Sequence, residues 1–161
     1  MSGLALKNHF SHQSIHDGYY TEGRDLTELL VKLFREERAE DCAVAADALV
    51  EHWETRTIAH ADSEEEGFYK EVIENQPEMR EDVIKLIRDH DLIRMIVADV
   101  KVRLPIEGVT EEVIDRFKTI LHLVDIHNHE EERVLFKQDH SHLEQIREQA
   151  EKPASGQEKC K

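Results

Sequence analysis

Four stretches of the chain carry apolar residues at alternating spacings of three and four, which is the pattern of a helix with one face against a core. They cover residues 9–33, 46–67, 83–104 and 113–134. In the third and fourth stretches this inward stripe is nearly unbroken and is interrupted only by histidines and one glutamate. The first stretch is weaker because Gly18 and Gly23 both disfavour a helix. The pattern therefore predicts four helices.

Three breaks separate the predicted helices. The first falls near residue 38 and contains no glycine or proline, and we expect Glu40 and Asp41 to cap the helix that follows it. The second is at residues 75–77, where a proline starts the next helix at a first-turn position. The third runs from Pro105 to Thr110, and Thr110 is expected to cap the last helix. We therefore expect an all-α fold, an up-down-up-down antiparallel four-helix bundle.

The length of 161 residues fits one domain, which we assign to residues 1–150, with a polar C-terminal tail at 151–161. A net charge of −15 disfavours nucleic acid and anionic membranes as partners. No window approaches 18 apolar residues, and the first twelve residues lack the apolar run of a signal peptide. The expected location is the cytoplasm. The two cysteines make neither a disulfide framework nor a thiolate metal site.

Eleven histidines are unusually many for this length, and within the predicted helices two of them precede a glutamate by four residues. His60 and Glu64 form one such pair, and His127 and Glu131 form the other. On a helix this spacing places both side chains on one face, about one turn apart, so that both can reach the same ion. One pair alone arises easily by chance in an acidic helix. Two pairs, each inside an apolar stripe, favour a metal site.

The histidines also lie at matching distances from the predicted breaks. The midpoint of His16 and His60 is residue 38, that of His60 and His90 is residue 75, and that of His90 and His127 falls inside the third break. In an antiparallel bundle, residues equidistant from a turn lie at one level. Four histidines from four helices are therefore expected to meet in one layer, with both glutamates about one turn to the same side.

Buried imidazoles and carboxylates without partners would be costly, and a metal ion removes that cost. Nitrogen and oxygen ligands without thiolates suit iron, manganese or zinc. Two carboxylates can bridge two ions, which would make the site dinuclear.

The order His, His-x-x-x-Glu, His, His-x-x-x-Glu over residues 9–140 resembles the hemerythrin-like HHE cation-binding family. The resemblance implies a four-helix bundle that holds two non-haem irons joined by an oxygen bridge and glutamates, with zinc or manganese as possible substitutes. It also implies that one iron takes its histidines from the first and fourth helices, the other from the second and third. The implied metal ligands are His16, His60, Glu64, His90, His127 and Glu131.

The sequence departs from the oxygen-carrying hemerythrins, which place two histidines four apart on the third helix. Here His90 has Leu86 and Arg94 at that spacing, so one nitrogen ligand is missing and reversible oxygen carriage is disfavoured. His12 lies on the inner stripe one turn from His16 and is either a substitute ligand or a partner of one. Tyr19, one turn on the other side, is either a core residue or a hydrogen-bond donor to a species at the metal.

The resemblance implies a protein that binds or reacts with small oxygen or nitrogen species, namely oxygen, nitric oxide or a peroxide. The alternatives are a di-iron enzyme for peroxide breakdown or iron–sulfur centre repair, and a bundle held together by a structural zinc-type ion. A protein partner is not indicated. Five other histidines are expected at the surface or the rim, namely His52, His122, His129, His140 and His142.

Overall fold

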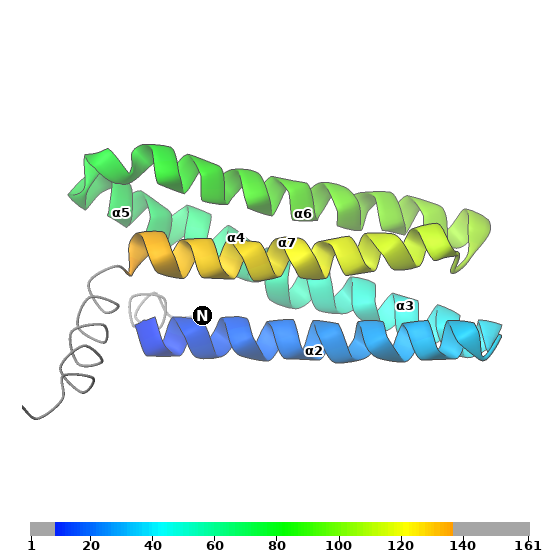
Figure 1. Cartoon of the computed structure of the whole chain (residues 1–161). Helices are drawn as coiled ribbons and strands as arrows, with labels where there is room; N and C mark the ends of the chain where they lie inside the picture. Colours follow the sequence, from blue (N-terminus) through cyan, green and yellow to red (C-terminus); the bar gives the residue numbers. More distant parts are fainter. Residues whose placement is uncertain (1–8, 137–161) are drawn as a thin grey trace, which may run out of the picture.

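The computed structural model describes residues 9–136, and Figure 1 shows their helices. Of these residues 94% are helical and none lies in a strand, which confirms the all-α class. The predicted tail at 151–161 lies outside the described residues. Within the described range no helix has an apolar stretch long enough to cross a membrane.

Four helical rods make up the described part of the chain. Three are single helices, and the second rod is a succession of short α-helical and π-helical segments. The single helices are α2 (His9–Arg35), α6 (Arg80–Glu107) and α7 (Glu111–Leu135). The composite rod comprises α3 (Ala39–His52), η1 (Trp53–Ile58), α4 (Ala59–Ser63), η2 (Glu64–Phe68) and α5 (Tyr69–Asn75), and the short η3 (Pro77–Met79) leads into α6.

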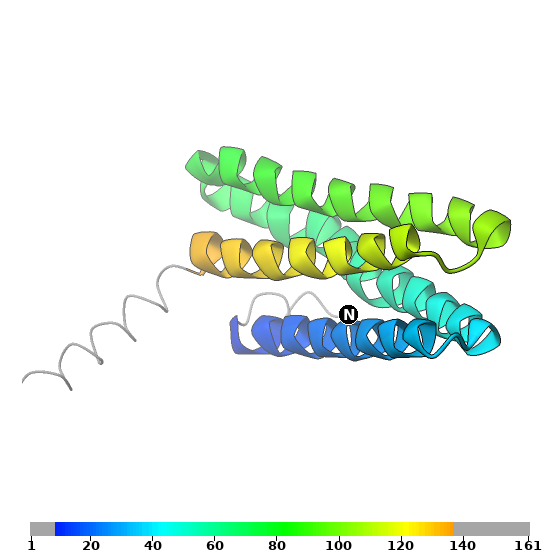
Figure 2. The ribbon, with the colours of Figure 1, turned by 45° about the vertical axis from the view of Figure 1, so that its right-hand side comes forward.

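The colours of Figure 1 let the chain be followed along α2, back along α3 to α5, out again along α6 and back along α7. The composite rod crosses the bundle obliquely. In Figures 1 and 2 its α3 end lies beside the end of α2, whereas its α5 end lies beside the start of α6. The segments η1, α4 and η2 therefore lie in the middle part of this rod, between α2 and α6.

The three predicted breaks are present, but two of their details were wrong. The first helix ends at Arg35, and the next begins after Arg38 without any side-chain cap. Asp41 instead lies in the first turn and accepts a hydrogen bond from Arg38 at 2.7 Å. The turn is made by Glu37, whose φ of 58° lies in the left-handed region.

The third break begins later than predicted. Pro105 does not end α6, which continues to Glu107 and stops where Gly108 adopts a φ of 69°. A proline so close to the end of a helix removes one backbone hydrogen bond without breaking a continuing helix. Thr110 caps α7 as predicted, because its Oγ1 accepts a hydrogen bond from the Val113 amide.

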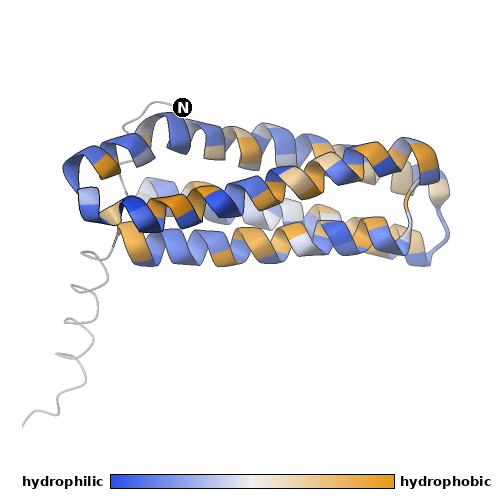
Figure 3. Ribbon diagram, turned by 90° about the horizontal axis from the view of Figure 1, so that it is seen from above, coloured by the Kyte–Doolittle hydropathy of each residue, from blue (hydrophilic) through white to orange (hydrophobic). Residues whose placement is uncertain are grey.

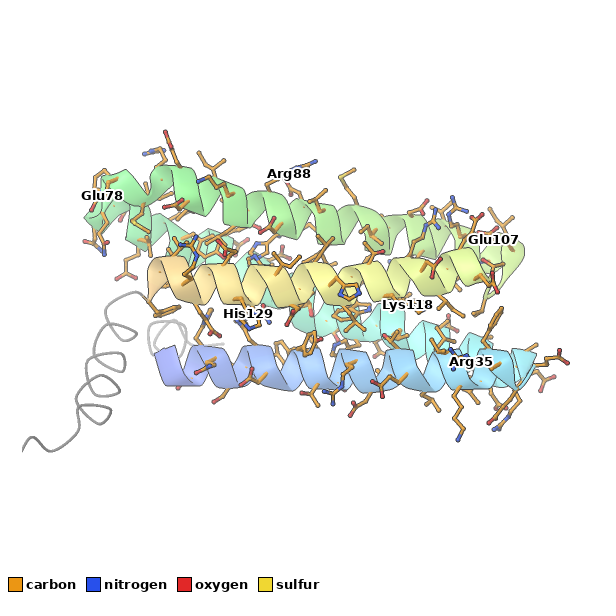
Figure 4. All side chains as sticks on the ribbon, in the orientation of Figure 1. Arg35, Glu78, Arg88, Glu107, Lys118 and His129 are labelled. Carbon is orange, nitrogen blue, oxygen red and sulfur yellow. The ribbon has the colours of Figure 1, made fainter. Side chains whose placement is uncertain are left out.

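Apolar side chains fill the bundle on both sides of the histidine level. The larger cluster includes Leu30, Trp53 and Phe117, and the smaller one contains Tyr69, Val83 and Leu86. Along α6 the smaller cluster comes before His90 and the larger one after it. Figure 3 shows the alternation of hydrophobic and hydrophilic residues along the helices, and Figure 4 shows charged side chains such as that of Arg88 pointing away from the bundle.

One glycine sets the distance between the first two rods. Gly23 of α2 is buried against Trp53 of η1, and a Cβ at this position would lie 2.5 Å from the Trp53 Cη2 atom. Gly18 lies on the same helix, is exposed, and has nothing within 4 Å of where its Cβ would be. Gly23 weakens the helix but allows α2 and η1 to approach each other more closely than a larger residue would.

We predict opposite effects for the same substitution at these two glycines. Gly18→Ala should stabilise the protein by about 0.5–1 kcal/mol, since alanine is the better helix former. Gly23→Ala should destabilise it by about 1–3 kcal/mol, because the added methyl group overpacks the contact with Trp53. Urea unfolding of the metal-free variants measures both changes. A shift in the same direction for both would contradict the proposed role of Gly23.

Candidate metal centre

Five histidine side chains meet in the interior of the bundle. His12 and His16 come from α2, His60 from α4, His90 from α6 and His127 from α7. None is more than 4% exposed, and His12 is fully buried. Each of them directs its Nε2 toward another histidine or a glutamate of the same cluster. The single histidine layer expected from the sequence is therefore present, with His12 added to it.

The first group of potential ligand atoms joins α2 to the composite rod. His12, His16, His60 and Glu64 each offer one atom, and these atoms lie within 4.8 Å of one another. Glu64 Oε1 is 2.6 Å from the Nε2 of His12 and 2.8 Å from the Nε2 of His60. The Nε2 atoms of His16 and His60 are 3.1 Å apart. Three imidazoles and a carboxylate thus surround one point.

The second group joins α6 to α7 and shares Glu64 with the first. The Nε2 atoms of His90 and His127 are 2.9 Å apart, and with Glu64 they offer three atoms within 4.8 Å of one another. Glu64 faces the first group with Oε1 and lies 3.5 Å from His90 Nε2 with Oε2. A carboxylate placed between two ligand groups is suited to bridge two ions.

Glu131 lies beside the first group. It is fully buried, and its Oε2 is 3.4 Å from His12 Nε2 and 3.5 Å from His16 Nε2. Its other oxygen, Oε1, accepts a hydrogen bond of 2.6 Å from the Tyr69 hydroxyl. All six predicted ligands therefore lie in one buried cluster.

The closest nitrogen pairs differ from those that the family resemblance implied. The resemblance pairs the first helix with the fourth and the second with the third. In the structure the shortest contacts between imidazoles join His16 to His60 and His90 to His127, which pairs the first rod with the second and the third with the fourth. The assignment of histidines to individual ions stays a prediction.

Burial and close packing set the protonation of this cluster. Burial lowers the pKa of His16 to about 4 and that of His90 to about 3, and the neighbouring His12 and His127 contribute in the same direction. Burial would also raise the pKa of Glu64, but hydrogen bonds from three histidines outweigh it and hold this pKa well below its ordinary value. The histidines with lowered pKa are therefore neutral bases, as metal ligands must be.

The pKa of Glu131 is shifted in the direction opposite to that of Glu64. Burial and the nearby charge of Glu64 raise its pKa to about 8. The metal-free cluster thus holds one ionised and one protonated glutamate. Glu64 Oε2 and Glu131 Oε2 are buried without a hydrogen-bond partner among the described residues. Cations between these carboxylates and the imidazole nitrogens would supply the missing partners, so the residues present fit a metal centre.

Further side chains hold the cluster in place. His90 donates from Nδ1 to Glu65 Oε1 at 2.8 Å, and this oxygen also accepts a hydrogen bond from Arg94 at 2.9 Å. Arg94 donates to Asp62 as well, at 2.6 Å. The proton on Nδ1 leaves the Nε2 of His90 free to bind a metal. Arg94, one turn after His90 on α6, thus helps to orient His90 through the shared Glu65 oxygen.

Two widened helical turns determine which residues of the second rod face inward. The π-helical segment η1 precedes His60, and the second one, η2, begins at Glu64. The three-four spacing predicted that Gly67 would lie on the inner face. Gly67 is exposed and Tyr69 is buried instead, because a π turn contains more residues than an α turn. The three-four pattern therefore missed Tyr69. The sequence does contain one signal for it, because Tyr69 and Phe136 are aromatic residues that lie nine positions after His60 and His127, respectively.

A small cavity opens beside the cluster. Its volume is about 20 Å³, which is somewhat more than the roughly 10–15 Å³ that a single water molecule needs. Tyr19 lines it and is half-buried, with its ring centre 5.9 Å from that of His60. The other lining residues are His16, Thr57, Ile58, His60, Ala61, Glu64, His90, Ile93, Val124, His127 and Asn128.

The remaining histidines divide as follows. His122 and His129 are exposed, as predicted. His52 was expected at the surface or rim but is only 5% exposed, packed against Trp53 with ring centres 4.9 Å apart. The composite rod turns it inward beside the close contact at Gly23. His140 and His142 lie outside the described residues.

The family profile described as the hemerythrin HHE cation-binding domain matches residues 16–138. The chain therefore belongs to this family, which confirms the resemblance seen in its sequence. Searches of curated proteins and of solved structures found no match. The family match and the His/Glu cluster together define a hemerythrin-type helical protein with a cluster of side chains that could hold metal ions. The match begins at His16 and does not include His12.

We predict that Tyr69→Phe weakens metal binding. The substitution removes the donor to Glu131 Oε1 and leaves that buried oxygen unpaired. Loss of such a supporting hydrogen bond commonly lowers metal affinity by about 10–100-fold. Competition with a chromogenic chelator for Fe²⁺ measures the change. Tyr20→Phe is the matched control, because Tyr20 packs against the larger apolar cluster. Equal affinities for the two variants would show that the Tyr69 hydroxyl does not support the centre.

Proposed function

We propose that this chain is a non-haem di-iron protein, a hemerythrin-type up-down bundle that binds or reacts with small oxygen or nitrogen species. One observation carries the proposal. Five imidazole Nε2 atoms and two glutamates share a buried layer, and a cavity of about 20 Å³ lies directly against it. The ligand atoms could hold the metal ions, and the cavity has room for the small reactant beside them.

The proposed iron ligands are the six predicted from the sequence, His16, His60, Glu64, His90, His127 and Glu131, together with His12. The fully buried position of His12 and its 2.6 Å contact with Glu64 support ligation. A nitrogen from the first helix then takes the place of the second histidine that the third helix lacks. Glu64 is the proposed bridge, since its two oxygens face different groups.

The donor atoms are compatible with iron, and the resemblance to the hemerythrin-like family is what favours iron among the metals they suit. Imidazole and carboxylate ligands without thiolate suit iron, and zinc and manganese are the expected substitutes. Bound iron would supply an open coordination position and one-electron exchange between its ferrous and ferric states. The protein orients His90 through Glu65 and Glu131 through Tyr69, and the apolar walls of the cavity limit the access of water.

The cavity also favours a reactive metal site over a purely structural one. A structural metal site is closed by protein ligands, whereas a reactive site keeps space for an additional ligand. The space beside this cluster has a volume of only about 20 Å³, so it admits one or two heavy atoms rather than an organic substrate. This favours dioxygen, nitric oxide or a peroxide as the species bound.

The metal content of single variants tests the ligand set. The wild-type protein, purified without oxygen, should contain about two irons per chain. His60→Ala and His127→Ala should each lose at least one of them, and His12→Ala should lose or weaken one. His129→Ala is the control, because His129 lies on α7 only two residues from His127 but is exposed (Figure 4). Full iron content in His60→Ala and His127→Ala would refute the ligand set.

The reactant is tested separately by titration of the ferrous protein. Addition of oxygen or nitric oxide should change the absorption spectrum in proportion to the iron content, and zinc-loaded protein should show no such change. Consumption of peroxide at a catalytic rate would instead identify an enzyme. A wild-type protein that holds two irons and responds to none of these reagents would contradict the proposed function while leaving the metal site intact.

A further inference from the structure

The wall of the cavity contains one buried hydroxyl group that has no hydrogen-bond partner among the described residues. Three polar residues line the cavity without belonging to the metal cluster, namely Tyr19, Thr57 and Asn128. Among these three, only Thr57 has a buried side-chain oxygen without a hydrogen-bond partner in the described part of the chain. Buried hydroxyls nearly always have partners, so this exception calls for a reason.

Other helical hydroxyls of this protein show what is unusual about Thr57. Those of Thr27, Thr55, Ser63 and Thr119 each donate to the carbonyl four residues earlier, at 2.7–2.9 Å. This local bond is the usual arrangement for serine and threonine inside a helix. Thr57 does not make it, although Thr55, two residues before it in η1, does.

The π turn explains the difference. The carbonyl four residues before Thr57 belongs to Trp53, the first residue of η1, whereas the corresponding carbonyl for Thr55 belongs to Glu51 in the regular helix α3. In a π turn each carbonyl pairs with an amide five residues later and the turn is wider, so the carbonyl is displaced from the side chain four residues on. The widened turn thus leaves the Thr57 hydroxyl without its local acceptor, at the cavity wall.

We propose that the Thr57 hydroxyl donates a hydrogen bond to the small ligand that occupies this cavity. The inference rests on the proposed function and adds a binding residue to it. The volume of about 20 Å³ restricts the ligand to about two heavy atoms. The walls include Ile58, Ile93 and Val124, which favour a species with little charge. The ligand class is therefore a diatomic molecule or a hydroperoxide with an oxygen or nitrogen that accepts the bond.

Nitric oxide binding by the ferrous-loaded protein tests the proposal. Thr57→Val keeps the shape of the side chain and removes the hydroxyl, and it should raise the dissociation constant for nitric oxide about three- to tenfold, as expected for one neutral hydrogen bond. Thr57→Ser retains the donor and should stay within about twofold of the wild type. Thr55→Val is the matched control from the same turn and should also bind normally, since Thr55 is exposed and bonded to Glu51.

The stability of the metal-free variants provides a readout that does not depend on the ligand. Thr57→Val should melt at the same temperature as the wild type or higher, because it removes a buried hydroxyl that has no partner. A structural role predicts a clear loss of stability instead. If Thr57→Val proves unstable, Thr57→Ser and Thr57→Ala, which are close in size, provide the same comparison with and without a hydroxyl.

The possible outcomes are distinguishable. Weaker nitric oxide binding by Thr57→Val, without loss of metal or stability, supports the proposal. Unchanged binding by Thr57→Val in a protein whose wild type does bind nitric oxide overturns it and leaves the proposed function standing. A wild type that holds iron but binds no nitric oxide, oxygen or peroxide overturns both.

Discussion

The structure depends on the burial of seven nitrogen- and oxygen-bearing side chains in one layer of a helical bundle. Such groups are costly to remove from water unless each finds a partner. In the metal-free protein they hydrogen-bond one another or Tyr69, but Glu64 Oε2 and Glu131 Oε2 stay without a partner among the described residues, and the pKa of Glu64 is lowered while that of Glu131 is raised. The cluster separates the two apolar clusters, so the core of this protein is not one continuous hydrophobic interior. A metal ion would therefore contribute to holding the fold as well as to its chemistry.

Much of this arrangement follows from the sequence. Helix rise is nearly constant, so histidines equidistant from a turn reach the same level, and this argument placed His16, His60, His90 and His127 together. This argument succeeded because the observed breaks lie close to the predicted ones. The extension of α6 past Pro105 and the missing cap at Asp41 change only the helix ends and leave the histidine level unaffected.

The features that depend on departures from the regular α-helix could not be predicted from the sequence. Nothing in the residues around Trp53 or Glu64 predicts a π turn, so the inward position of Tyr69 and the unpaired hydroxyl of Thr57 were not predicted. His52 was missed for a different reason, because it lies in the regular helix α3 on the buried face of Cys42 and Leu49, which the predicted stripe did not include. His12 could be placed at the right level but not assigned a role, because level alone does not say which atoms meet. These features depend on how the rods pack against one another, and three of them lie on the composite rod.

The contact between Gly23 and Trp53 has a consequence that reaches beyond its own position. It lies two helical turns, about 10 Å, from His16 along α2. It fixes how near α2 comes to the rod that carries His60, and the two imidazoles can approach to 3.1 Å only if those backbones stay close. The geometry of the ligand layer is thus governed in part by a residue with no donor atom in its side chain. A relative with a bulkier group at this position would need a smaller one opposite to keep the same spacing.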